Sequence, residues 1–296
     1  MWQTKITEML GIEYPIIQGA YGGFGTSVLA GPVSEVGGLG IITASALRTP
    51  ERLKEDIAKA RAMTDKPIGV NLSPGMLPNI DDMVKATIEQ GIKVVETAGG
   101  SSEIYGRRLK EAGVVWIHKV ATVRHAVSAE KQGADAVVIV GIEGAGGKSS
   151  IQVPTLINIP LATKVLKIPV IAAGGIGDAR SFMAALAMGA EAVYMGTAFM
   201  ATKECPISDR YKQSIVDRSA FEPAFRARVL APPGAMIVEM VPQEGGAPIH
   251  ETDEDGRRIS GVSLAVAAVD KVITVKELIQ EMITGAEVIR RRWALS

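Results

Sequence analysis

The sequence predicts an α/β protein built as a TIM-type (β/α)₈ barrel. Short apolar runs rich in β-branched residues alternate with amphipathic stretches of about ten to fifteen residues, which is the pattern of repeated strand and helix units. The apolar runs are continuous rather than alternating, as expected for strands covered on both faces. With 296 residues, 47% of them hydrophobic, the chain is long enough for one large barrel.

The apolar runs can be counted along the chain, and each has the length of a strand. Eight strands joined by seven crossovers fit a closed parallel barrel better than an open doubly wound sheet, and no G-x-G-x-x-G loop follows the first run. The predicted strands cover residues 15–18, 39–43, 67–71, 93–97, 114–120, 136–141, 169–175 and 192–197.

Helical patterns fill several of the intervals between these runs. Pro50 stands at a favourable first helical position, and the three later helices end in glycine, a good residue just past a helix end. The segments GADAVVIVG and GAEAVYMG repeat one helix–turn–strand plan, as a βα repeat requires. The expected helices cover residues 50–64, 80–91, 123–133 and 178–189.

The tail of the chain has a different character. We expect residues 1–221 to form the barrel and residues 222–296 a loop and helical extension that packs on it as a lid or flank. A helical pair is expected over residues 259–272 and 274–293, and Thr274 with Glu277 predicts a capping box at the start of the second helix.

Composition excludes several function classes. Lys+Arg and Asp+Glu balance at 32 each and aromatics are 4%, so neither a nucleic-acid surface nor a polybasic membrane patch is expected. The apolar runs are too short to span a membrane, one cysteine, Cys205, cannot form an internal disulfide, and no metal-ligand spacing appears. We expect a cytoplasmic protein with a small-molecule substrate and leave homo-oligomerisation open.

The active site of such a barrel lies at the carboxyl ends of its strands. Gly174-Gly175 ends the seventh run and Gly196-Thr197 ends the eighth. Phosphorylated ligands commonly bind after these two strands, where glycines let the backbone approach closely and a hydroxyl adds a donor. The conjunction of the two glycine motifs therefore predicts a phosphate site.

Other predicted strand ends carry uncharged polar groups suited to the edge of a flat heterocycle, namely Gln18, Asn71 and Thr97. For Asn71 and Thr97 the alternative is ordinary hydrogen bonding at the barrel rim. Lys119 faces the barrel mouth or interior, where its charge needs a partner. That partner is a bound phosphate or other anionic ligand, or a strand-end acid such as Glu96; a Schiff-base lysine is the third reading. His118 should point to the opposite face.

At these residues the sequence resembles the nitronate monooxygenase (2-nitropropane dioxygenase) family, with the flavin-dependent enoyl-ACP reductases as close cousins. The resemblance covers roughly residues 3 to 215 in order and weakens in the C-terminal quarter. It is carried by the segments PIIQGA, GGLGII, KPIGVNL, VVETAG, WIHKVATVRHAVSAEKQGADAV, PVIAAGGIGDA and AVYMGTAFMATKECPI.

The resemblance implies a TIM barrel with one non-covalent FMN. By this likeness the first strand-end loop lies near the flavin, Asn71 and Lys119 contact it, and the glycine motifs hold its phosphate. The implied cofactor-binding residues are Gln18, Gly19, Ala20, Asn71, Lys119, Ala145, Gly146, Gly174, Gly175, Gly196 and Thr197.

The sequence departs from the family where the chemistry is usually carried. Many members have Asp-Gly-Phe-Glu-x-x-Gly-His after the sixth strand, but here Val140 takes the Asp position and Gly147 the His position. Ala198 replaces the arginine of the family's Gly-Thr-Arg-Phe. We expect Lys148, beside the vacated position, or Tyr21, where a methionine is common, to handle protons. Lys148 is equally open to a role as a phosphate-binding or solvated lysine.

Four hypotheses follow from these residues. The first is an FMN-dependent, nitronate monooxygenase-like oxidoreductase that oxidises a nitronate or small carbon acid with O₂. The second is a flavin reductase of an enoyl thioester or related conjugated substrate, with NAD(P)H as electron donor. The third is an aldolase or isomerase with Lys119 as Schiff-base nucleophile, and the fourth is a non-catalytic flavin-binding protein.

Overall fold

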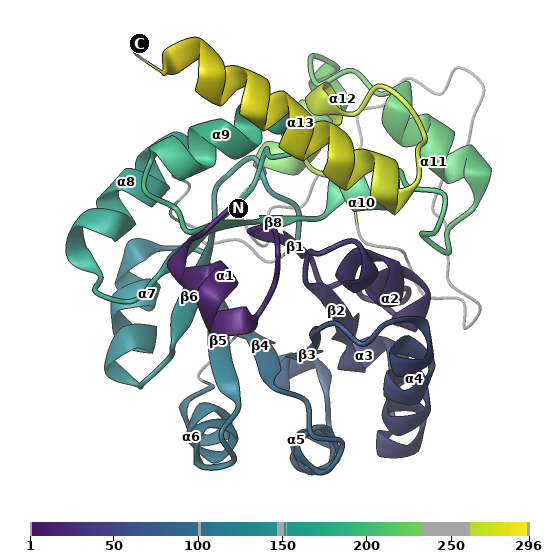
Figure 1. The fold of residues 1–296 in the computed structure, drawn as a ribbon, viewed down its shortest axis with the longest axis vertical. Helices are drawn as coiled ribbons and strands as arrows, with labels where there is room; N and C mark the ends of the chain where they lie inside the picture. The colour runs from purple at the N-terminus through teal and green to yellow at the C-terminus, as the bar shows by residue number, and fades with distance from the viewer. Residues whose placement is uncertain (1, 100–101, 147–150, 152, 232–260, 295–296) are drawn as a thin grey trace.

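A computed structural model describes residues 2–99, 102–146, 151, 153–231 and 261–294. In this part of the chain eight parallel strands run in the order β1-β8-β7-β6-β5-β4-β3-β2, and a bridge between Ile17 and Leu39 joins β1 to β2 and closes the ring. The predicted TIM barrel is confirmed (Figure 1). The strands are β1 (Ile16–Gln18), β2 (Gly40–Thr43), β3 (Ile68–Leu72), β4 (Val94–Ala98), β5 (Val115–Val120), β6 (Ala136–Val140), β7 (Val170–Ala173) and β8 (Ala192–Met195).

Helices surround the barrel and match the four expected helical segments. Pro50 stands in the first turn of α4 as predicted, and the glycines that follow α5, α7 and α9 have positive φ. The helices are α1 (Lys5–Leu10), α2 (Ser27–Glu35), α3 (Ala44–Leu47), α4 (Pro50–Met63), η1 (Pro74–Met76), α5 (Ile80–Glu89), α6 (Glu103–Glu111), α7 (Val123–Lys131), α8 (Thr155–Val165), α9 (Ala179–Ala187), α10 (Thr197–Met200), α11 (Asp209–Val216), α12 (Pro223–Leu230), η2 (Leu264–Ala268) and α13 (Val275–Trp293).

The barrel interior is filled by its own cluster of apolar side chains. Ile17, Val94, Ile117 and Val138 are almost wholly buried inside the ring, and α1 adds residues of its own to the same cluster. A filled interior makes the barrel a packed core rather than a channel, so ligands are confined to its ends.

The C-terminal tail was predicted only in part. Helix α13 begins with the expected capping box of Thr274 and Glu277, and it packs closely on α9. The helix expected over residues 259–272 is wrong in extent, because only the short 3₁₀ helix η2 forms among the described residues there. The small side chains of η2 sit against the loop after β7, where a Cβ on Gly177 would lie 3.2 Å from Ala268 Cβ.

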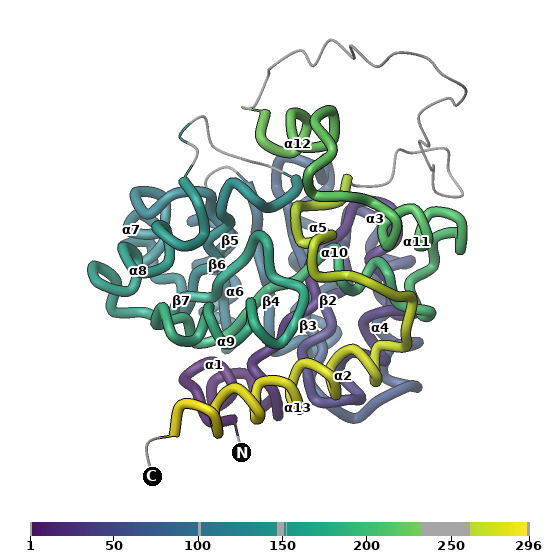
Figure 2. Tube along the Cα trace, turned by 90° about the horizontal axis from the view of Figure 1, so that it is seen from above, coloured from purple at the N-terminus to yellow at the C-terminus, as the bar shows by residue number. Residues whose placement is uncertain are grey.

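Figure 2 shows α13 running back along the outside of the barrel, beside α2, toward the N-terminus. There the Arg290 guanidinium lies 5.9 Å from the ring centre of Trp2. Within the described residues no helix has both the length and the apolar character needed to cross a membrane.

Helix α2 approaches β2 so closely that only glycine fits at the contact. A Cβ on Gly40 would lie 1.9 Å from the Ala30 carbonyl oxygen, whereas a Cβ on Gly75 meets no atom within 4 Å. We expect Gly40→Ala to lower the free energy of unfolding by about 1–3 kcal/mol or more, because the helix must move. Gly75→Ala should stay within about 0.5 kcal/mol. Urea unfolding of both variants measures this, and equal stability would contradict the close contact.

Candidate active site

The ends of β7 and β8 form the part of the rim where the sequence predicts a phosphate. Gly174 and Gly175 follow β7 with φ of 101° and 74°, a left-handed conformation that favours glycine. A Cβ on Gly174 would lie 3.0 Å from Thr155 Oγ1. The backbone therefore turns sharply at this point, as a loop that wraps an anion with its N–H groups requires.

Thr155 and Glu143 tie this turn to the loop after β6. Thr155 donates its hydroxyl to the Glu143 carboxylate at 2.8 Å and lies 3.0 Å from the Gly174 carbonyl oxygen. A Cβ on Gly175 would lie 3.3 Å from Glu143 Cβ. A side chain at position 175 would thus press on Glu143. The neighbour that such a side chain meets is therefore Glu143, in addition to any phosphate bound at this turn.

Thr197 begins α10 directly after β8. Its hydroxyl is buried and lies 2.8 Å from Ser263 Oγ, and the Ser263 backbone N–H donates to it at 2.9 Å. Sequence reasoning missed Ser263, which belongs to the tail and follows no motif. The contact ties the C-terminal segment to the rim of the barrel.

The loop after β1 lies against the end of β8. Gly19 donates its N–H to the Met195 carbonyl at 2.7 Å, and a Cβ there would lie 2.9 Å from the Tyr194 ring. Ala20 donates its N–H to the Tyr194 hydroxyl at 2.6 Å. Gln18 accepts the Ile41 N–H at 3.1 Å through its side-chain oxygen, so its amide is part of the barrel wall.

Tyr21 extends this loop across to the β8 end. Its hydroxyl donates to the Gly196 carbonyl oxygen at 2.8 Å, and its ring stacks on Phe24 with 4.6 Å between ring centres. Burial raises the pKa of Tyr21 well above its ordinary value. The phenol stays protonated and holds the two loops of the predicted cofactor site together.

Asn71 and Glu96 lie side by side on β3 and β4 and face the barrel interior. They are paired in register, and the Asn71 amide donates to Glu96 Oε2. Tyr194, on the far side of the ring, donates its hydroxyl to the same oxygen at 3.4 Å. Burial, and next the charge of Glu96, raise the pKa of Tyr194 well above its ordinary value, so this phenol also stays protonated.

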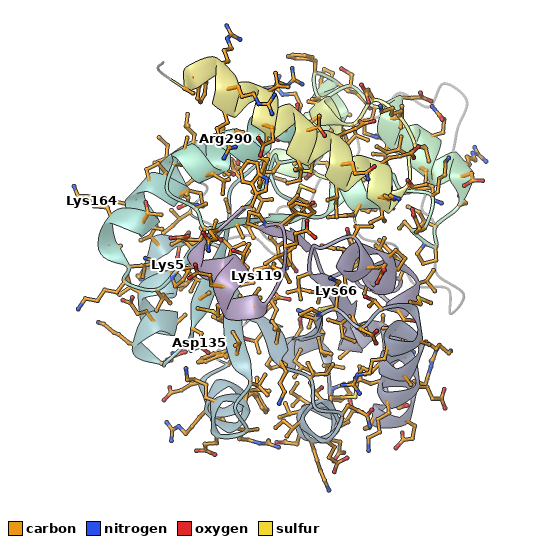
Figure 3. The ribbon with its side chains drawn as sticks, in the orientation of Figure 1. Lys5, Lys66, Lys119, Asp135, Lys164 and Arg290 are labelled. Atoms are coloured by element: carbon orange, nitrogen blue, oxygen red, sulfur yellow. The ribbon has the colours of Figure 1, made fainter. Side chains whose placement is uncertain are left out.

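Lys119 points into the same end of the barrel from β5. Figure 3 shows it near the middle of the molecule, whereas Lys164 lies at the left edge. Its Nζ lies 5.2 Å from the ring centre of Tyr194. Among the described residues no ion pair within 4.0 Å joins Lys119 to Glu96, so the strand-end acid is not its partner.

The outer face of the barrel holds the residues next to these in sequence. Thr97 Oγ1 lies 2.7 Å from both His118 Nδ1 and Trp116 Nε1. Because an indole N–H only donates, the Thr97 hydroxyl accepts from Trp116, and the direction of its bond with His118 follows the tautomer of the imidazole. Thr97 therefore makes hydrogen bonds within the protein on the outer face of the barrel and does not face a ligand. His118 lies on the face opposite to that of Lys119, as predicted.

The loop after β6 is described only in its first part. Gly144 donates its N–H to the Gly141 carbonyl at 3.0 Å, Ala145 is half-buried and Gly146 has φ of 86°. Gly147 and Lys148 lie outside the described residues.

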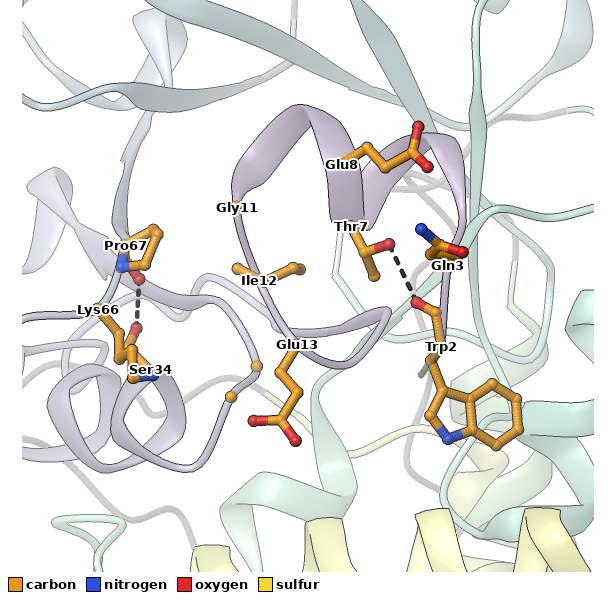
Figure 4. A pocket seen from close by; sticks show the side chains of 12 residues that line it. Trp2, Gln3, Thr7, Glu8, Gly11, Ile12, Glu13, Ser34, Lys66 and Pro67 are labelled. Carbon is orange, nitrogen blue, oxygen red and sulfur yellow. Dashed lines mark hydrogen bonds between the residues drawn. The ribbon is translucent and has the colours of Figure 1, made fainter.

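A cavity at the other end of the barrel is separate from this site. It has a volume of about 390 Å³ and is lined by segments that precede strands, including Glu13 before β1 and Lys66 before β3 (Figure 4). Since the catalytic groups of (β/α)₈ barrels lie at the carboxyl ends of the strands, we assign the candidate active site to the opposite end.

Besides Ser263, sequence reasoning missed two residues that lie in the barrel interior beside Asn71 and Lys119. Tyr194 was read only as part of an apolar strand, and Glu96 only as an alternative partner for Lys119. The alternation of side chains along a strand could have indicated Glu96, because Glu96 lies two residues before the end of β4 and therefore shares a face with Ala98.

A parallel eight-stranded barrel with flanking helices defines the class of TIM-barrel proteins, in which phosphorylated ligands commonly bind after the seventh and eighth strands. Within that class the chain belongs to the nitronate monooxygenase family, whose family model matches residues 3–231. The family is one of oxidoreductases.

Two curated relatives are similar to this chain over about seven tenths of its length. A (3aS,4S,5R,7aS)-5-hydroxy-7a-methyl-1-oxo-octahydro-1H-indene-4-carboxyl-CoA dehydrogenase of Mycobacterium tuberculosis is 38% identical over 71% of this chain and 59% of its own length. A probable nitronate monooxygenase of Staphylococcus aureus is 33% identical over 73% of each chain. The chain thus spans less than two thirds of the dehydrogenase's length.

Solved structures resemble the whole chain. FabK from Thermotoga maritima is 32% identical, covers 98% of each chain and has a TM-score of 0.82. A nitroalkane oxidase from Streptomyces ansochromogenes, 22% identical with a TM-score of 0.77 over 97% of this chain and 99% of its own, shares the fold.

The buried imidazole of His118 makes stability depend on pH. Burial lowers the pKa of His118 to about 4, below its ordinary value, so between these two values the unfolded chain binds a proton that the folded chain does not. Stability is therefore lost as the pH falls through this window. We expect His118→Asn to reduce the loss of unfolding free energy between pH 7 and 4.5 by roughly 2–3 kcal/mol. Urea unfolding at both pH values measures this; parallel losses would contradict it.

Proposed function

We propose that this chain is an FMN-dependent oxidoreductase. The observation that carries the proposal is the rim at β7 and β8, where the consecutive left-handed residues Gly174 and Gly175 lie beside the start of α10 at Thr197. Backbone N–H groups in such turns bind phosphate oxygens. The family membership of the chain supports the same reading.

The residues of the barrel mouth fit the ring of a flavin. Asn71 has an amide hydrogen beyond the one it gives to Glu96, and Lys119 has no carboxylate within ion-pair distance among the described residues. Glu96 Oε1 is buried, and the residues that the structure describes give it no hydrogen-bond partner. A flat heterocycle with polar edges would supply partners for these groups.

FMN, when bound, supplies two-electron redox chemistry that no side chain offers. The residues of this chain bind and orient it. Gly174, Gly175 and Gly196 would hold the phosphate with their backbone, and Thr197 would share its hydroxyl between Ser263 and a phosphate oxygen. The loop at Gln18-Gly19-Ala20, Asn71 and Lys119 would hold the ring, with Ala145 and Gly146 beside it.

The first candidate reaction is the oxidation of a nitronate or small carbon acid with O₂. It rests on the family model and on the Staphylococcus aureus relatives. A nitronate is already deprotonated, so its oxidation can proceed without the imidazole that Gly147 replaces. Lys148 or Tyr21 would donate or accept any proton that must move. In this structure the Tyr21 hydroxyl donates to the Gly196 carbonyl oxygen.

The second candidate reaction is the NAD(P)H-dependent reduction of an enoyl thioester or related conjugated substrate. One observation favours it: FabK is 32% identical to this chain with a TM-score of 0.82, whereas the nitroalkane oxidase is 22% identical with a TM-score of 0.77. The relative from Mycobacterium tuberculosis is named for a carboxyl-CoA substrate. Protonation of the enoyl α-carbon would need an acid, which again directs attention to Lys148. A cytoplasmic location and a small-molecule substrate remain predictions for either reaction.

We expect the purified protein to be yellow and to release FMN on denaturation. Gly175→Ala should lower FMN retention at least about tenfold, because an alanine in the left-handed conformation costs roughly 1–2 kcal/mol and its methyl group presses on Glu143. Gly113→Ala is the matched control: Gly113 has a similar φ of 70° and lies in the turn before β5, at the other end of the barrel.

Bound flavin is measured by absorbance and by chromatography of the released cofactor. A colourless protein that FMN cannot reconstitute would sink the proposed function. Borohydride trapping of Lys119 in such a protein would instead support an aldolase or isomerase. If both glycine variants retained FMN equally, the placement of the phosphate would be wrong.

Anaerobic flavin reduction separates the two candidate reactions. We expect an alkyl nitronate to bleach the flavin at least about tenfold faster than NADH or NADPH if the first reaction is correct. The opposite order, with reoxidation by an enoyl thioester, would establish the second. Stopped-flow absorbance with the donors in parallel measures this, and a flavin that none of them reduces would leave a non-catalytic flavin-binding protein.

A further inference from the structure

The buried carboxylate of Glu96 is only half satisfied. The side chain is 0% exposed, and its Oε2 accepts hydrogen bonds from the Asn71 amide and the Tyr194 hydroxyl. Within the described residues its Oε1 has no partner. A buried carboxylate oxygen without a donor is costly, so a ligand that carries an N–H or O–H group would be stabilised at this point.

The groups around Glu96 have fixed hydrogen-bonding roles. Ser73 donates its hydroxyl to Asn71 Oδ1 at 3.2 Å, and the Asn71 amide nitrogen points to Glu96, so the amide orientation is set. One amide hydrogen of Asn71 remains available. On the other side, Lys119 on β5 can only donate, and its Nζ lies over the Tyr194 ring.

Three neighbouring strands thus present a donor, an acceptor and a donor. Asn71 on β3 offers an N–H, Glu96 on β4 offers Oε1, and Lys119 on β5 offers its ammonium group. All three side chains share the inward face, since Asn71 pairs with Glu96 in register and Lys119 lies two residues beyond Ile117 of the interior cluster. The complement of this order is a ring edge that carries carbonyl, N–H and carbonyl groups.

We propose that Glu96 is the residue that recognises the imide edge of the flavin, by accepting a hydrogen bond from its ring N3–H. This inference rests on the proposed function and adds a specificity-determining residue to it. Asn71 and Lys119 donate to the two flanking carbonyl groups. Tyr194 holds the carboxylate from the far side of the ring and is itself fixed by the Ala20 N–H.

The substitution Glu96→Gln tests this arrangement sharply. Because two donors already converge on Oε2, the single oxygen of glutamine stays with Asn71 and Tyr194, and its NH₂ group takes the place of Oε1. A donor then faces the donor N3–H. Glu89→Gln is the matched control, since Glu89 lies on the surface at the end of α5 and pairs with Lys54 at 2.8 Å.

The experiment measures the dissociation constants of FMN and of 3-methyl-FMN, whose N3 carries a methyl group in place of hydrogen, by flavin fluorescence with the apoprotein. We expect wild type and Glu89→Gln to prefer FMN by about ten- to a hundredfold. Glu96→Gln should bind FMN more weakly by a similar factor and lose most of that preference. Circular dichroism and thermal melting of the apoproteins check that each variant folds.

The outcomes are separable from a failure of the proposed function. Wild type that binds FMN and 3-methyl-FMN equally well overturns the role of Glu96 while the FMN site stands, as does a Glu96→Gln variant that keeps the full preference. Wild type that binds neither flavin overturns the proposed function and this inference together. The wild-type measurement needs no variant, so equal binding of the two flavins overturns the role of Glu96 even if Glu96→Gln does not fold.

Discussion

The closure between β1 and β2 is the constraint on which the rest of the structure depends. It rests on a short seam: Leu39 donates its N–H to the Ile16 carbonyl and Gln18 to that of Leu39, both at 2.9 Å. The next rung of a parallel ladder would run from Ile41 to the Gln18 backbone, but the Gln18 side-chain oxygen accepts that N–H at 3.1 Å. One glutamine therefore extends the seam and frees the chain to turn at Gly19 against β8.

Closure converts a linear order of strands into a ring and brings distant residues together. Tyr194 of β8 reaches Glu96 of β4 across the interior, although 98 residues separate them in sequence. The alternation of side chains along each strand then decides which residues face the barrel interior. Glu96 and Lys119 point inward, while their sequence neighbours Thr97 and His118 point outward. The same two segments thus supply both the candidate site and a buried structural network.

The sequence was most informative where the backbone carries the signal. Eight apolar runs located every strand, and the glycines at positions 174 and 175 located a turn with positive φ, because both depend on local preferences. Side-chain partners were harder to predict. Ser263 reaches Thr197 from the tail. From residue 261 onward the segment expected to be helical forms only the short 3₁₀ helix η2, because its contacts with the barrel rather than its own periodicity set its shape.

This difference explains why the cofactor is easier to infer than the reaction. A phosphate is recognised by turns and by N–H groups, which any sequence with the right glycines can form. A substrate is recognised by particular side chains, and the family's imidazole position holds Gly147 here. A ring held by Glu96 and Lys119 would meet a negative and a positive group at one edge, so the balance of these two charges bears on how readily the ring accepts electrons. That balance would belong to residues on β4 and β5, whereas the position of the family's imidazole falls after β6 in the sequence. Under the proposed function, different strand ends of this barrel would therefore govern the redox chemistry and the choice of substrate.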